Sequence, residues 1–139
     1  MSDPYDLKRF LDAQAGVIDA VRAELGRGRK ASHWMWFVFP QIRGLGFSAM
    51  AQRYAISGLD EARAYAAHPV LGARLVECTA LVLAAETRSV REIFGTPDDL
   101  KFHSSMTLFA HAVPGEPLWR RALEKFFDGR EDAATLERL

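Results

Sequence analysis

The chain has 139 residues, which is the usual size of one domain and too few for two well-filled cores. Apolar residues make up 49% of it and charged residues 26%, so the chain can bury a normal core beneath a charged surface. Its 18 basic residues match its 18 acidic ones, which leaves no overall field to recruit nucleic acid or anionic lipid. The composition therefore predicts one folded domain over residues 1–139 and argues against nucleic acid as a partner.

The sequence also lacks the marks of export or membrane insertion. The single cysteine, Cys78, excludes an internal disulfide and leaves too few thiolates for a cysteine-based zinc site. The N-terminus is acidic, with no basic segment followed by an apolar one, so it does not resemble a secretory signal. The longest apolar runs, 34–39 and 80–85, are far shorter than the ~20 residues of a membrane-spanning helix. We therefore expect a cytoplasmic protein that is not embedded in a membrane.

The first predicted helix begins at Asp3-Pro4, where an N-cap residue precedes a proline at the first helical position. Apolar residues follow at helical spacing as far as Leu25, and Gly26 and Gly28 are suited to end the helix. The pattern predicts a single helix over this stretch.

An aromatic segment, residues 34–39, comes next, with Ser32 placed to cap it and Pro40 placed to end it. Its composition fits a short helix and a buried strand equally well. We favour the helix because the sequence offers no second strand for this segment to pair with. Two glycines then make residues 41–47 a loop.

Two further short helices are predicted after the loop. Ser48 is placed to cap a helix that extends through Tyr54. Ser57 with Asp60 resembles a capping box, in which two side chains satisfy each other's backbone donors, for a helix over residues 59–67.

A central helix is predicted from Pro69 to about Glu86. Its apolar residues recur at alternating steps of four and three, and more apolar residues lie on its other sides. We expect a helix with so little polar surface to be the most buried in the domain. Its main apolar stripe consists of Leu71, Leu75, Cys78, Val82 and Ala85.

The C-terminal part continues the same pattern of caps and helices. Residues 89–92 match a capping box for a short helix, and residues 96–99 begin a longer helix bounded by Pro114. Residues 117–127 and 132–139 are predicted as two more helices. The sequence therefore predicts an all-α fold, a compact single domain of about seven short to medium helices.

Several motifs spread over the chain point to a known family. They are SHWMWFVFPQIRGLG, LDEARAY, HPVLG, DDLK and SSMTLF, which start at residues 32, 59, 68, 98 and 104. Together they resemble the bacterial domain-of-unknown-function family 1810, some members of which carry a calpastatin label. The resemblance implies an all-helical fold and attaches no activity or catalytic residue. We discount the label, because calpain inhibition resembles the work of long disordered chains and this composition is that of a packed domain.

The aromatic segment and its loop form the first candidate site. Trp34 and Trp36 are so close on one short element that both cannot easily face the same core, so one of them could line a groove. Filling the core is the more common use of such rings. His33 and Gln41 are polar groups that flank the segment, and Arg43 lies beside glycines where a backbone can approach a ligand.

The helix over residues 97–113 carries the second candidate site. Lys101 lies in its first turns, where the helix dipole disfavours a cation, which invites either a binding role or a salt bridge. One side of the helix is polar, although serine and threonine weaken a helix slightly. That side either faces water or binds a ligand. Its candidate binding residues are Ser104, Ser105 and Thr107, with His103 and His111 beside them.

Other kinds of site find less support in the sequence. The four histidines form no metal-binding pattern, so we expect no metal site and no cofactor. Cys78 falls in the apolar stripe, where a thiol would be buried, protonated and inert. The basic run at residues 25–30 could contact phosphate or simply be solvated.

The first hypothesis is a small binding domain with a pocket between residues 33–46 and helix 97–113. A small, flat, anionic ligand, such as a nucleotide-like compound, would stack on one of the two tryptophans. Arg43 and Lys101 would pair with its phosphate or carboxylate.

Two other hypotheses stay open. One is an enzyme acting on a nucleotide-like or ADP-ribose-like compound, with His33 or Asp99 as proton carrier. The other is a protein-interaction module without a pocket, in which exposed aromatic residues serve as an anchor. A pocket lined by His33, Arg43 and Lys101 would favour binding or catalysis, and an exposed aromatic patch would favour the interaction module. The sequence does not indicate the oligomeric state of the protein.

Overall fold

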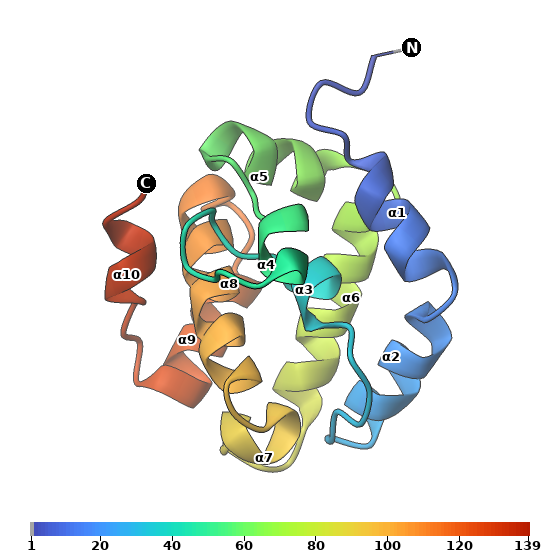
Figure 1. Ribbon diagram of the computed structural model, residues 1–139. Helices are drawn as coiled ribbons and strands as arrows, with labels where there is room; N and C mark the ends of the chain where they lie inside the picture. The colour runs from blue at the N-terminus through green and yellow to red at the C-terminus, as the bar shows by residue number, and fades with distance from the viewer. Residues whose placement is uncertain (1) are drawn as a thin grey trace.

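The computed structural model describes residues 2–139, and within that range the regular structure is helical (Figure 1). An isolated parallel bridge between Ile42 and Ile56 is the one β-type pairing there. The all-α prediction is confirmed, with more helices than the seven or so expected. They are α1 (Lys8–Ala15), α2 (Ile18–Gly26), α3 (Met35–Val38), α4 (Ala49–Arg53), α5 (Leu59–Ala67), α6 (Leu71–Ala84), α7 (Val90–Phe94), α8 (Asp98–Ala112), α9 (Leu118–Phe127) and α10 (Ala133–Leu136).

The single helix predicted for the N-terminal region is wrong, because the chain breaks between α1 and α2. Gly16 ends α1, and Val17 has a backbone φ of −129°, outside the helical region. Glycine is a poor helix former, and the break lets α1 pack on α3 while α2 packs on α6. Asp3 was predicted to cap a helix that begins at Pro4. Its carboxylate instead accepts from the backbone N–H groups of Leu7 and Lys8, at the start of α1.

The aromatic segment forms the one-turn helix α3, so the choice of helix over strand is confirmed. Phe39, at its end, packs edge-to-face on Phe94 and Phe102, with ring centroids 5.8 and 5.1 Å apart. The aromatic segment therefore packs against both α7 and α8 through Phe39.

In Figure 1, α6 and α8 both cross the middle of the view, with α1 and α2 on one side and α10 on the other. Helix α9 packs on both α6 and α8. The prediction that α6 is the most buried helix is wrong. Nine of the 15 residues of α8 are buried, against six of the 14 of α6. The reason is that α8 is covered by α5, α7, α9 and α10, whereas α6 keeps one face toward solvent.

The apolar stripe of α6 nevertheless lies in the core, so substitutions in it are expected to lower stability. Leu75 and Val82 are both fully buried, so truncation to alanine leaves a cavity beside α2, α5 or α9. We expect Leu75→Ala and Val82→Ala each to lower the free energy of unfolding by about 2 to 4 kcal/mol in chemical denaturation. A loss below about 0.5 kcal/mol would contradict this placement of the helix.

Helices α5 and α6 meet at an angle of 88°. At the corner, Gly72 lies directly against the backbone carbonyl of Ala66, with no room for a side chain. Among residues 2–139 no single helix is long and apolar enough to cross a membrane, although the bent pair of α5 and α6 together has the length and composition of a broken span.

Candidate functional site

The loop between α3 and α4, residues 41–47, is held rigidly at its start. The backbone N–H of Ile56 donates to the carbonyl of Gln41, and the N–H of Arg43 donates to the carbonyl of Ile56, both at 2.8 Å. Gly44 has a φ of +101°, and a Cβ there would lie 2.5 Å from the guanidinium of Arg138. The positive φ favours glycine at this position, whereas the Arg138 side chain is flexible and could move aside. We call residues 43–47 the glycine loop.

Behind the glycine loop, the structure brings together Trp36, Gln41 and Lys101, as the sequence predicted. Their side chains line a cavity of about 10 Å³, which has room for about one water molecule. The ammonium group of Lys101 lies 5.1 Å from the centre of the Trp36 ring and covers that face of it. A flat ligand therefore has no space between the aromatic segment and helix 97–113, which corrects the predicted pocket.

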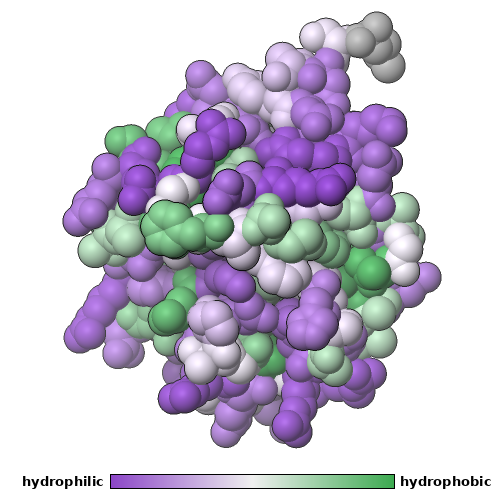
Figure 2. All heavy atoms as spheres, in the orientation of Figure 1, coloured by the Kyte–Doolittle hydropathy of each residue, from purple (hydrophilic) through white to green (hydrophobic). Residues whose placement is uncertain are grey.

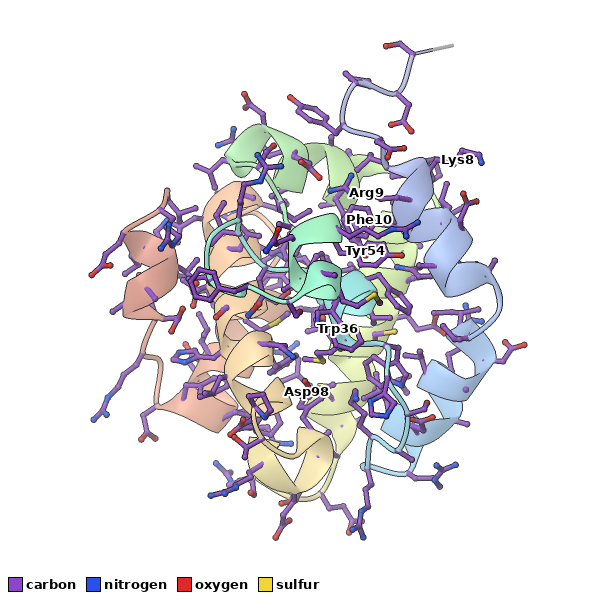
Figure 3. All side chains as sticks on the ribbon, in the orientation of Figure 1. Lys8, Arg9, Phe10, Trp36, Tyr54 and Asp98 are labelled. Carbon is purple, nitrogen blue, oxygen red and sulfur yellow. The ribbon has the colours of Figure 1, made fainter. Side chains whose placement is uncertain are left out.

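Lys101 belongs to a cluster of two lysines that share one carboxylate. Asp98 accepts from Lys101 Nζ at 3.0 Å and pairs with Lys30 Nζ at 2.8 Å. Burial raises the pKa of Asp98, but the hydrogen bonds from the two lysines outweigh burial and lower the pKa overall. The salt bridge accounts for a cation in the first turns of α8. In Figure 3, Trp36 lies between Tyr54 and Asp98 on the face toward the viewer.

Trp34 is a core residue, with 1% of its surface exposed. Its indole Nε1–H donates to Glu24 Oε1 at 2.9 Å. The same carboxylate oxygen accepts from the backbone N–H groups of Ala31 and Ser32, and Oε2 accepts from the Ser32 hydroxyl. Trp34 therefore has no face for a ligand, and of the two tryptophans Trp36 is the one that lines the small cavity.

The serine and threonine residues on the polar side of α8 face the interior of the protein and not water, which corrects their interpretation. Ser104, Ser105 and Thr107 are all buried. The Ser104 hydroxyl donates to Asp132 Oδ2 at 3.1 Å, and Thr107 Oγ1 accepts from the backbone N–H of Asp132 at 2.9 Å. Asp132 in turn caps α10 by accepting from the N–H of Thr135. Ser104 and Thr107 therefore dock the C-terminal helix onto α8, whereas the buried Ser105 hydroxyl has no hydrogen-bond partner among the described residues.

The groups considered for proton transfer do not meet at the cavity. His33 is exposed and lines none of the hollows described here, and Asp99 accepts from the Thr96 hydroxyl at 2.9 Å beside the start of α8. Cys78 is buried as predicted, and burial raises the pKa of its thiol to about 12, which keeps it protonated.

Arg43 is exposed on the outer side of the glycine loop and does not line the small cavity that contains Trp36. It borders a hollow of about 380 Å³ that is also lined by Gly44, Gly46, Phe47 and Gln52. Phe47 has 83% of its surface exposed, the highest value among the large hydrophobic residues described. Figure 2 shows hydrophobic side chains gathered where this loop crosses the face toward the viewer.

Sequence reasoning missed Phe47 as a site residue. The available signal was an aromatic residue placed directly after a glycine in a loop that has no need of it for packing. The backbone of Phe47 is fixed, since its carbonyl accepts from Gln52 Nε2 at 2.7 Å and the next residue, Ser48, caps α4. The exposed ring therefore stands on a rigid base.

Comparison with known proteins gives a fold and a family. The chain is similar to the crystal structure of the conserved hypothetical protein Rv1873 from Mycobacterium tuberculosis, with 56% sequence identity and a TM-score of 0.97. The match covers 99% of this chain and 98% of the other. No curated protein matches significantly. A family model described as "Protein of unknown function (DUF1810)" matches residues 4–139, and the chain therefore belongs to that family.

Proposed function

We propose that this domain binds a small, flat, anionic ligand in the hollow on the outer side of the glycine loop. Phe47 supplies the stacking face and Arg43 the cation. The exposure of Phe47 carries the proposal, because a large aromatic ring on a rigid loop is costly to leave in water and gains stability when a ligand covers it.

The size and charge of the hollow support a ligand of this kind. A volume of about 380 Å³ falls within the ~300 to 1,000 Å³ of small-molecule sites. The side chain of Arg43 makes no hydrogen bond or ion pair with any residue in 2–139. Among the described residues no carboxylate lines this hollow, although Arg43 also borders a neighbouring hollow that contains Asp6 and Glu61. From the glycine-loop side, the guanidinium can pair with a phosphate or carboxylate.

Binding has more support than catalysis at this place. The residues that line the hollow include no histidine, carboxylate or thiol. A reaction on a nucleotide-like compound needs such a group within reach of the substrate to carry a proton. We therefore keep the enzyme hypothesis as the weaker one.

A screen of nucleotides and aromatic carboxylates by thermal shift, followed by fluorescence titration, tests the proposal. We expect Arg43→Ala and Phe47→Ala each to weaken binding at least about tenfold, since each removes one main contact. Both side chains are exposed, so the free energy of unfolding should stay within about 1 kcal/mol of wild type. Arg121→Ala, an exposed arginine away from the hollow, is the matched control and should bind as wild type does.

The protein-interaction module is the second candidate function, and the same exposed ring favours it. An aromatic side chain that protrudes from a rigid loop is typical of an anchor that inserts into a partner protein. If no compound binds the wild-type chain, or if both variants bind as well as wild type, the ligand proposal fails and this alternative takes its place.

A further inference from the structure

A larger groove of about 940 Å³ lies at the end of the molecule where α2 ends and α7 begins (Figure 1). One wall is the basic loop at residues 26–30, and the other is formed by residues 84–87 and 91–95. We propose that this groove binds the phosphate chain of a small phosphorylated molecule, at a site separate from the glycine loop.

The wall that carries the basic loop is held in place from inside the protein. The carboxylate of Glu24 accepts four hydrogen bonds from the residues that follow the loop, and Lys30 pairs with Asp98 at 2.8 Å. The backbone N–H of Arg29 donates to the carbonyl of Glu24 at 3.0 Å. Arg27 and Arg29 therefore extend from a fixed backbone, as groups that recognise a ligand do.

The two walls are also fixed relative to each other. The backbone N–H of Lys30 donates to the carbonyl of Ile93 at 2.7 Å, which ties the loop to α7. On the second wall, which contains α7, the side chain of Glu92 accepts from the Thr87 hydroxyl at 2.5 Å. The N–H of Glu92 donates to the Ser89 hydroxyl. The groove is thus formed before any ligand arrives, which lowers the entropy that binding must overcome.

The charges in the groove favour an anion. Arg27, Arg29 and Arg91 are exposed, and within residues 2–139 their guanidinium groups have no ion-pair or side-chain hydrogen-bond partner. Glu86 and Glu92 are the carboxylates that line the groove, and the second is engaged by Thr87. The arginines therefore outnumber the carboxylates, and their planar donor groups match the oxygens of phosphate.

The size of the groove and the overall charge indicate a small molecule rather than nucleic acid. A volume of about 940 Å³ is near the upper end of small-molecule sites, enough for a ligand of nucleotide size. The whole chain carries no net charge, so it lacks the extended positive field that holds a nucleic acid backbone.

Titration calorimetry of inorganic tripolyphosphate into the full chain tests the inference. We expect wild type to bind it, with an affinity that falls as salt increases. The double variant Arg29→Ala/Arg91→Ala, which removes one arginine from each wall, should bind at least about tenfold more weakly. Arg121→Ala and Arg43→Ala should bind as wild type does, and dichroism melts should show that all variants are folded.

Arg43→Ala separates this inference from the proposed function, because it damages the glycine-loop hollow and leaves the groove intact. Absence of binding to wild type at millimolar tripolyphosphate would overturn the inference. So would equal weakening in Arg121→Ala, which would indicate non-specific attraction. Tighter binding of a single-stranded oligonucleotide than of tripolyphosphate would overturn it as well, and would assign the groove to nucleic acid.

Discussion

Replacing Glu24 with alanine is expected to lower the free energy of unfolding by about 4 kcal/mol, because four donors lose their acceptor at once. Only 6% of the Glu24 surface is exposed, and the donors include the indole of buried Trp34. Trp34 is itself buried, so its indole N–H becomes a buried donor without an acceptor. Chemical denaturation at neutral pH measures the loss, and a change below about 1 kcal/mol would show that the carboxylate does not hold the loop.

The same carboxylate makes stability depend on pH. Burial raises the pKa of Glu24, but the hydrogen bonds from Ser32, Ala31 and Trp34 outweigh burial and lower the pKa to about 2 from an ordinary value near 4.5. Because the folded pKa lies below the unfolded one, the stabilisation is fully present above about pH 4.5. It is lost progressively as the pH falls from there toward 2.

Glu24→Gln is the control that isolates this effect. Oε1 accepts three of the four hydrogen bonds, so an amide oxygen in its place keeps most of the geometry while removing the charge. We expect the glutamine variant to be less stable than wild type at pH 7 and to approach it between pH 4.5 and 3, since only wild type loses stabilisation there. A gap that stays constant with pH would contradict the lowered pKa.

The helices that could be predicted are those whose signals are local. Ser48 and Ser89 cap α4 and α7 as expected, because each cap concerns a side chain and a backbone N–H three residues away. The prediction was less accurate where a serine had two nearby carboxylates to choose between, as in the capping box predicted for Ser57 and Asp60. Ser57 bonds Glu61, not Asp60, and Glu61 is at the same time the partner of Arg9 from α1. The sequence pattern alone did not show which of the two carboxylates would make both contacts.

The candidate site could be predicted less well, because burial depends on how distant elements pack. The polar side of α8 has the pattern of a solvated or ligand-binding face, and only the position of Asp132 shows that it receives α10. Helical spacing also says nothing of the direction in which a loop presents its side chains. Arg43 was expected beside the tryptophans, but pairing of the loop with Ile56 directs it to the outer side, next to Phe47.

Gly72→Ala is expected to lower the free energy of unfolding by about 4 kcal/mol or more, in the range of severe overpacking. The reason is the corner between α5 and α6, where a Cβ on Gly72 would overlap the carbonyl of Ala66 and lie 2.8 Å from its carbon. Both atoms belong to the backbone, so no side-chain rotation relieves the contact. The helices would have to separate, which would disturb the buried Ala62 and Leu75 on either side of the corner.

Gly16→Ala is the matched control for this last prediction. Gly16 has a helical φ of −91°, and a Cβ there would meet nothing within 4 Å. Alanine at this position should leave stability unchanged or raise it by up to about 1 kcal/mol, because it restricts the unfolded chain. Chemical denaturation of both variants, followed by far-ultraviolet dichroism, makes the comparison. If Gly72→Ala behaved like Gly16→Ala, the close approach of α6 to the end of α5 would be disproved, and with it the reason for glycine at this corner.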